Sequence, residues 1–304
     1  MAARLVGVGH MPVLDVAPPD WVALAASAGF GAVGVRAAAA SPGEDRWPMD
    51  VGSPMLRETL LRLADTGVVV PDVEIIRLDA GTRPEAFRPL FETGAALGAR
   101  FVNAIAFDPE PARAGDNAAA LAGLAAQHGL RLSLEAIPYS TVRNLDEAVA
   151  VLGSSTGGLI IDPLHLQRSG DGLSRVRVLD PDRVSYLQLC DAPRAAPSGL
   201  TRPARLPRNQ AGADDDLAIE ARAARLVPGD GELPLTDLTA MLPADLPVSA
   251  EVPNLALREE LGTQEFLHRI RGGIDRVLRR AGSPPGHDRR ASMSDVPAGT
   301  AGPS

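Results

Sequence analysis

The sequence predicts a single α/β domain folded as a (β/α)8 barrel, from its length, its hydrophobic content and a regular alternation of segment types. The chain has 304 residues, which accommodates the roughly 250 residues of such a barrel plus extensions. Hydrophobic residues make up 45% of the chain, but aromatic residues only 3%, so the core must consist mainly of aliphatic side chains. Short apolar runs alternate with longer amphipathic runs, the pattern of parallel βα units.

Eight short apolar segments are predicted as strands: Leu5–Gly9, Ala32–Arg36, Val68–Ile76, Phe101–Ile105, Arg131–Glu135, Leu159–Asp162, Val184–Leu189 and Val248–Glu251. The segments between them are predicted as helices: Pro19–Ala28, Pro54–Asp65, Pro84–Leu97, Asn117–His128, Asn144–Leu152, Leu173–Leu179, Leu235–Met241 and Arg258–Arg280. Several of these segments begin with Pro in the first turn or with an Asn or Thr cap, which are signals for the start of a helix.

Two regions depart from the alternation. Ala192–Ala224 is an insertion after the seventh strand, rich in Pro, Arg and Ala before it turns acidic. A loop that follows a barrel strand lies at the active-site end, so we interpret it as a lid or rim, with a flexible connector as the alternative. From Gly282 the sequence has almost no apolar residues, which predicts a disordered tail. The predicted domains are a barrel over residues 1–281 and a tail over residues 282–304.

Composition excludes several classes of function. The net charge of −8 argues against a surface for nucleic acid or an anionic membrane, since both need clustered cations. The chain contains no lysine, which argues against Schiff-base enzymes, pyridoxal phosphate enzymes and phosphate-loop NTPases. With one cysteine, Cys190, no intrachain disulfide can form. No secretory signal or membrane-spanning stretch is evident, so we expect a cytoplasmic protein.

Polar side chains end four successive strands. Glu135, Asp162, Gln188 and Glu251 lie at the carboxyl ends of the fifth to eighth predicted strands, and in a barrel these ends converge on one face. Any one of them alone is more often a solvated loop residue or a helix cap. Three carboxylates directed at one point, however, repel one another unless a cation or a shared proton neutralises them. The joint pattern therefore predicts a site for one divalent metal ion.

The motifs around these strand ends resemble the xylose isomerase-like barrels, a group of sugar phosphate isomerases and epimerases. The resemblance covers roughly residues 4–280, and five motifs carry it: Leu134-Glu135, Asp162-x-x-His165, Gln188-Leu189-Cys190-Asp191, Pro228-Gly229-Asp230-Gly231-Glu232 and Ala250-Glu251-Val252-Pro253. It implies that Glu135, Asp162, Gln188 and Glu251 bind the metal, and that the Pro-Gly turn shapes the rim of the site.

The resemblance also implies the roles of the substrate-facing residues. Glu135 and Glu251 are the catalytic acid–base pair, one removing a proton from carbon and the other returning it on the opposite face. His165 and Arg194 hold the substrate oxygens. From their places in the predicted strands, His10, Glu74 and Asn103 are further candidates for the pocket wall, although Glu74 equally suits an ion pair inside the barrel or at its rim.

One position departs from the family pattern. The family usually has histidine where this chain has Gln188. An amide oxygen is a harder and weaker ligand than imidazole, so we expect Mn²⁺ or Mg²⁺, with Co²⁺ or Zn²⁺ as alternatives. Glutamine at this place also occurs in some bacterial 3-dehydroshikimate dehydratases of the same superfamily, which favours a lyase as the second hypothesis.

The expected function is a metal-dependent isomerase or epimerase that abstracts a proton next to the carbonyl of a small sugar-like ketone. The alternative enzyme is a metal-dependent dehydratase of the 3-dehydroshikimate or inosose type. An apurinic-site endonuclease of the same fold would need a histidine-rich three-zinc cluster, and this chain has only five histidines. A non-catalytic binding barrel could dispense with the metal ligands, which are all present here. The expected partner is a small polyhydroxylated substrate, and a homo-oligomer is left open.

Overall fold

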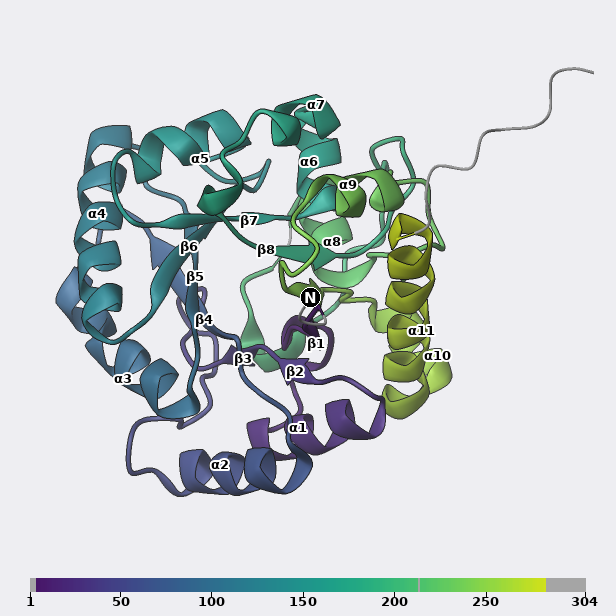
Figure 1. Ribbon diagram of the computed structural model, residues 1–304, viewed down its shortest axis with the longest axis horizontal. Helices are drawn as coiled ribbons and strands as arrows, with labels where there is room; N and C mark the ends of the chain where they lie inside the picture. Colours follow the sequence, from purple (N-terminus) through teal and green to yellow (C-terminus); the bar gives the residue numbers. More distant parts are fainter. Residues whose placement is uncertain (1–3, 213, 283–304) are drawn as a thin grey trace, which may run out of the picture.

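The computed structural model describes residues 4–212 and 214–282. Nine parallel strands form a nearly closed barrel, and helices lie between them in sequence and around them in space (Figure 1). The predicted barrel is therefore confirmed. In chain order the strands are β1 (Val6–Val8), β2 (Ala32–Val33), β3 (Val35–Arg36), β4 (Asp72–Leu78), β5 (Phe101–Ala106), β6 (Arg131–Glu135), β7 (Gly158–Ile161), β8 (Val184–Leu189) and β9 (Val248–Ala250).

The segment predicted as the second strand is divided into β2 and β3 at Gly34. β2 pairs with β1, whereas β3 pairs with β4, so the two pieces end the sheet on its two sides. A Cβ atom at position 34 would lie 2.7 Å from Asp72 Oδ2 and 3.1 Å from Glu74 Oε1. Glycine is thus required at the point where the barrel nearly closes around two buried carboxylates.

The third predicted strand begins later than expected. The prediction was Val68–Ile76, whereas β4 spans Asp72–Leu78. Pro71 explains the shift, because proline has no N–H group to donate to a sheet. The residues before it form only an isolated bridge, Val69 with Ala32.

The helices are bounded by the signals that the sequence contains. They are α1 (Pro18–Ser27), α2 (Pro54–Thr66), α3 (Arg88–Leu97), α4 (Pro111–Gln127), α5 (Leu145–Leu152), α6 (Pro163–Ser169), α7 (Gly172–Arg177), α8 (Asp216–Ala223), α9 (Leu235–Met241), α10 (Leu255–Leu261) and α11 (Thr263–Gly282). The side chains of Ser53 and Asn144 cap α2 and α5 by accepting backbone N–H bonds. Two of these helices, α6 and α8, were not predicted from the sequence.

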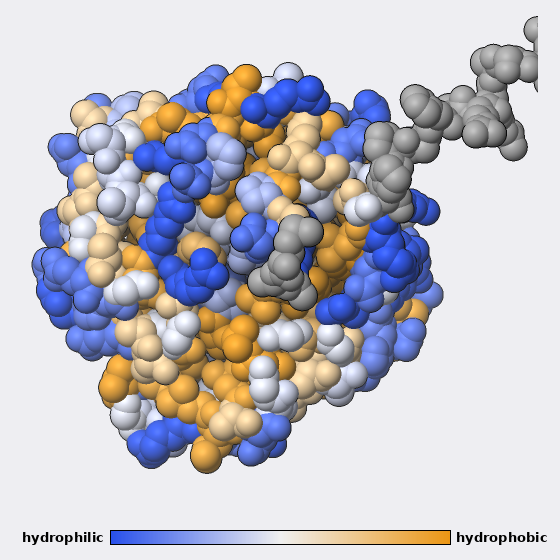
Figure 2. All heavy atoms as spheres, in the orientation of Figure 1, coloured by the Kyte–Doolittle hydropathy of each residue, from blue (hydrophilic) through white to orange (hydrophobic). Residues whose placement is uncertain are grey.

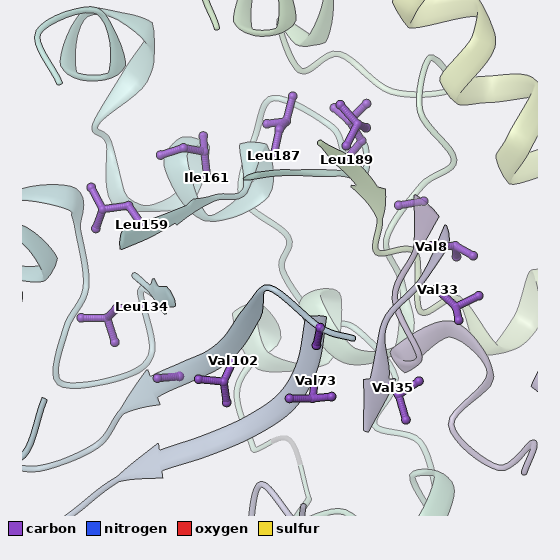
Figure 3. Close-up of a cluster of buried hydrophobic side chains, with 14 of the residues drawn as sticks. Val8, Val33, Val35, Val73, Val102, Leu134, Leu159, Ile161, Leu187 and Leu189 are labelled. Atoms are coloured by element: carbon purple, nitrogen blue, oxygen red, sulfur yellow. The ribbon is translucent and has the colours of Figure 1, made fainter. Parts of the chain in front are cut away.

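The main core lies between the barrel and its helices. Aliphatic side chains at alternate strand positions point away from the barrel axis (Figure 3), because successive side chains of a strand face opposite sides. α11 packs on this layer with Phe266, Ile270, Ile274 and Val277 buried at helical spacing. Its other side is hydrophilic at the outer edge of the molecule (Figure 2). Within the described residues, no helix is both long and apolar enough to cross a membrane.

The inside of the barrel is partly polar. Tyr186 packs there with Phe101 and Ile160, and the Ser133 hydroxyl donates to Ser185 at 2.7 Å. Toward the opening, Asn103 donates to the buried Asp72 carboxyl at 3.3 Å. Burial raises the pKa of this carboxyl well above its usual range, and the nearby Glu74 and Glu251 raise it further. The apolar layer outside the barrel therefore supports the fold, while the interior combines apolar side chains with polar groups.

The insertion crosses the active-site end of the barrel, as predicted, and contains α8. Arg168 of α6 holds both of its ends: the guanidinium binds both Glu220 carboxylate oxygens at 2.7 Å and donates to the carbonyls of Pro193 and Arg194. Both side chains of the Arg168–Glu220 pair are buried. The predicted tail lies outside the described residues, apart from Gly282, which ends α11.

We predict that Phe266→Ala destabilises the domain by about 3–5 kcal/mol, because it removes a fully buried aromatic ring and leaves a cavity. Equilibrium unfolding in urea measures this loss. Val178→Ala is the control, since Val178 is 71% exposed and its truncation should cost far less. Equal losses for the two variants would contradict the packing described for α11.

We predict that Arg168→Gln loosens the insertion, because breaking a buried ion pair costs about 3–5 kcal/mol. Trypsin should cleave within residues 192–212 at least about tenfold faster than in the wild type, since local opening gives the protease access to the backbone beside the arginines of this segment. The control Arg46→Gln breaks only an exposed pair with Asp50, worth about 0–1 kcal/mol. An unchanged rate of cleavage in Arg168→Gln would show that the Arg168–Glu220 ion pair does not hold the insertion in place.

Candidate active site at the carboxyl ends of the strands

The four strand-end residues predicted as ligands are all buried at the same end of the barrel. Each follows an outward-facing aliphatic residue of the core, namely Leu134, Ile161, Leu187 and Ala250. Strand alternation therefore turns Glu135, Asp162, Gln188 and Glu251 toward the barrel interior. The site is a direct result of the period-two pattern of these strands.

Asp162 has two roles. It is the N-cap of α6, and its Oδ1 accepts from Leu164 N at 2.8 Å and His165 N at 3.2 Å. This capping fixes the carboxylate and starts the helix that presents His165. One ligand atom each from Glu135, Asp162 and His165 lie within 4.8 Å of one another. His165 Nε2 is 3.7 Å from Glu135 Oε1.

The sequence-based prediction did not identify Arg225, which lies at the centre of this cluster. Its Nη1 is 2.5 Å from Asp162 Oδ2, and its Nη2 is 3.0 Å from Glu251 Oε2. Nη2 also lies 3.4 Å from His165 Nε2. One buried guanidinium thus bridges two carboxylates that come from different strands.

The backbone of Arg225 is tied to the ends of β8 and β9. Leu226 forms an antiparallel bridge with Asp191, and Ala224 forms one with Asn254. Arg225 N donates to Pro253 O at 3.2 Å, and the Asn254 side chain donates to Arg225 O at 2.9 Å. The arginine is therefore positioned by the same strands that present Gln188 and Glu251.

The Pro-Gly-Asp-Gly turn is built on Asp191, the residue that follows the Gln188-Leu189-Cys190 run. The Asp191 carboxylate accepts from Ala192 N, Gly229 N and Leu233 N at 2.8–3.0 Å. Gly229 has a φ of +90°, and a Cβ at Gly231 would lie 2.5 Å from Asp191 Oδ1. Both glycines are needed for the turn to close on this carboxylate.

Burial and mutual repulsion set the charge state of the acids. Burial, followed by repulsion from Glu251 and Asp162, raises the pKa of Glu135 well above its usual range. Burial also raises the pKa of Glu251, to about 7, although Arg225 opposes the shift. For Asp162 the effect of burial is outweighed by Arg225 and by hydrogen bonding, so its pKa is lowered. Burial lowers the pKa of His165 to about 4, which leaves the imidazole neutral.

These residues fit a divalent cation. Glu135 Oε1 and Gln188 Oε1 are buried and have no hydrogen-bond partner in the described part of the chain, and such groups are normally satisfied by protein, water or an ion. Arg225 pairs with two of the three carboxylates, Asp162 and Glu251, whereas within the described residues no arginine lies within ion-pair distance of Glu135. Glu135, Asp162 and His165 could together hold a metal with the oxygen and imidazole donors that divalent ions accept.

A small cavity of about 60 Å³ opens beside the cluster, and its wall includes Glu135, His165, Arg225 and Glu251. Arg194 lies elsewhere: it is exposed, and its backbone N donates to Glu232. The arginine that the structure pairs with the predicted ligands is Arg225. It is the first residue of the Arg225-Leu226-Val227-Pro228-Gly229 run, so the Pro-Gly motif was the available signal for finding it.

Residues of the insertion close the cavity, which Gln210, Ala221 and Arg222 line from above the strand ends. Arg36 of β3 lines it from the other side and pairs with Glu74 at 2.9 Å and Glu44 at 3.1 Å. Glu74 is therefore an ion-pair partner behind the wall.

His10 and Asn103 are not wall residues of this cavity. His10 is fully buried, stacks on Trp21, and binds Val16 O and Arg36 N through its two ring nitrogens. Asn103 contacts Asp72 inside the barrel.

Comparisons with known proteins show solved structures with the same fold. One solved structure with the same fold is the IOLI protein with a bound zinc atom, at 15% identity and a TM-score of 0.68, covering 92% of this chain and 100% of that one. Another is a D-allulose 3-epimerase from Methylomonas sp., at 16% identity and a TM-score of 0.63, covering 91% and 99%.

A third is a xylose isomerase-like TIM barrel/4-hydroxyphenylpyruvate dioxygenase fusion protein, at 18% identity and a TM-score of 0.63, covering 94% of this chain. This chain spans 46% of the length of that fusion protein. No curated protein sequence matches the chain.

The family model for the xylose isomerase-like TIM barrel matches residues 22–271. This range includes every strand-end residue of the site and Arg225. The chain belongs to the xylose isomerase-like TIM barrel family.

Proposed function

We propose that this protein is a divalent-metal-dependent isomerase or epimerase that acts on a small polyhydroxylated ketone. The observation that carries the proposal is the joint placement of Glu135 and Glu251 in one cavity wall, with His165 and Arg225 beside them. The two glutamates come from strands three positions apart in the barrel order. They therefore approach a bound substrate from different sides, as proton transfer between two faces of a carbon requires.

Glu135, Asp162 and Glu251 would hold the ion, with Gln188 as the fourth ligand predicted from the sequence. Bound there, a divalent ion supplies Lewis acidity at the substrate carbonyl, which makes the neighbouring C–H more acidic. Mn²⁺ or Mg²⁺ suits a set dominated by carboxylate and amide oxygens. Zinc in the IOLI protein, which has the same fold, makes Zn²⁺ the principal alternative.

The chain's own side chains would then move the proton. One glutamate removes it from the carbon next to the carbonyl, and the other returns it to the opposite face or to the neighbouring carbon. Arg225 and His165 contact the substrate oxygens and hold them in place. The cavity is smaller than the roughly 300–1,000 Å³ of most ligand pockets, so substrate entry requires the insertion residues that line it to move outward.

A dehydratase is the second candidate, and Gln188 is the observation that favours it. The same proton abstraction can be followed by loss of a hydroxyl group from the next carbon. The two outcomes differ in their products, since a dehydratase releases water and forms a conjugated product that absorbs ultraviolet light. Ketoses, inososes and 3-dehydroshikimate form the substrate panel that separates the two reactions.

We predict that, in deuterium oxide, the enzyme incorporates solvent deuterium into the carbon next to the carbonyl of its substrate. Glu251→Gln should lower the rate of incorporation by about 10²-fold or more, because it removes one acid–base group while keeping the side-chain shape. Glu259→Gln is the matched control, since Glu259 is exposed. Proton NMR of the substrate measures the exchange. No incorporation with any substrate of the panel, and no dehydration product, would refute the proposed chemistry.

We predict that chelation abolishes turnover and that Mn²⁺ or Mg²⁺ restores it. Gln188→His should retain metal but shift the preference toward Zn²⁺, since imidazole is the softer ligand. Elemental analysis after dialysis against equal concentrations of the ions measures this shift independently of activity. If chelation leaves turnover undiminished, the metal-dependent mechanism fails and only the barrel assignment stands.

A further inference from the structure

We propose that Arg225 is the resident counter-ion of the metal site, and that a divalent ion binds only after the Arg225 guanidinium has left Asp162. This inference rests on the metal dependence proposed above and adds a condition on how the ion is loaded. It concerns which cation lies between the carboxylates of Asp162 and Glu251, and not the proposed contact between Arg225 and the substrate.

The first argument is the position of the guanidinium. Nη1 and Nη2 lie 2.5 Å and 3.0 Å from oxygens of Asp162 and Glu251, so the group fills the space between two predicted ligands. An ion held by both carboxylates would lie about 2.0–2.6 Å from their oxygens, in the same space. The guanidinium and the ion are therefore alternatives at this position.

The second argument is that Asp162 has little coordination capacity left. Its Oδ1 accepts from two backbone N–H groups of α6, and its Oδ2 faces Arg225. By contrast, Glu135 Oε1 and Gln188 Oε1 have no partner within the described residues. One half of the proposed ligand set is ready for an ion, whereas the other half is engaged by the arginine.

The third argument is that Arg225 cannot leave at low cost. Its backbone is bridged to both neighbouring strand ends, and its Nε donates to Ala221 O at 2.8 Å. A guanidinium also stays protonated throughout the physiological pH range, so deprotonation cannot release it. Displacement must instead come from a rotation of the side chain, and its cost lowers the affinity for the ion.

The test is calorimetric titration of MnCl2 into the full chain after chelator treatment and dialysis. Arg225→Gln should bind Mn²⁺ at least about tenfold more tightly than the wild type, because no cation competes for Asp162 and Glu251. Arg88→Gln removes the same charge from an exposed helix end, where Arg88 pairs with Glu85, and should match the wild type. Binding by Arg225→Gln that is equal to or weaker than that of the wild type would overturn the proposal.

Arg225→Lys distinguishes the effect of the space that the guanidinium fills from the effect of its positive charge. A single ammonium keeps the positive charge but cannot bridge both carboxylates in the forked geometry of a guanidinium. Its Mn²⁺ affinity should lie between those of the wild type and Arg225→Gln. If it equals the wild type while Arg225→Gln binds more tightly, charge alone sets the affinity and displacement is excluded. This variant also allows the test if Arg225→Gln does not fold.

Thermal unfolding is a second readout that does not depend on activity. Without metal, Arg225→Gln should melt below the wild type, since it leaves buried carboxylates unpaired. Mn²⁺ should raise its melting temperature more than that of the wild type, because a more tightly bound ligand stabilises the folded state further. A larger shift for the wild type would contradict the proposal. If neither the wild type nor any variant binds Mn²⁺, the proposed metal dependence fails as well. If the wild type binds Mn²⁺ but Arg225→Gln does not bind it more tightly, this inference alone fails.

Discussion

The ion pairs of Arg225 with Asp162 and Glu251 are the interaction on which the rest of this candidate site depends. Three carboxylates are buried where four strands end, and leaving buried charges unpaired costs several kcal/mol per ion. A barrel with this pattern of strand ends must therefore supply a cation inside its own fold, bind one from solvent or keep a carboxyl group protonated. Arg225 meets part of that requirement, and the unpartnered oxygens of Glu135 and Gln188 mark the part that it does not meet.

Much of the irregular structure around the barrel serves to position that one side chain. The Asp191 carboxylate organises the Pro-Gly-Asp-Gly turn, and the bridge between Asp191 and Leu226 places Arg225 beside the end of β8. On the other side of the insertion, Arg168 holds α8 through Glu220, and the Ala221 carbonyl of α8 accepts from Arg225 Nε. The insertion is thus both the cover of the cavity and the support of its central cation.

The sequence predicted the strands that carry the site because their signal is local. β6 and β8 have the predicted bounds, and the alternation of aliphatic and polar residues turns Glu135 and Gln188 inward. Arg225 was missed because it lies 37 residues after Gln188 along the chain, across an insertion whose path depends on long-range pairs. Asp162 was predicted only as a ligand, and α6 was missed, although Asp162-Pro163 is also a helix start. The family resemblance implied Arg194 as the arginine that faces the substrate, whereas the strand bridges bring Arg225 to the site.

Arginine at position 225 gives the site a more constant positive charge than lysine would. The pKa of a buried lysine shifts readily with its surroundings, so its charge would depend on what else the site held. A guanidinium keeps its charge and the forked arrangement of its N–H donors at every physiological pH. The carboxylates of Asp162 and Glu251 are therefore never without a counter-ion. The site can then stay folded and closed before an ion arrives, at the cost of affinity for that ion. If an ion must displace Arg225 as proposed, activity depends on a competition between this internal cation and the external one, and the contacts of Arg225 set the balance between them.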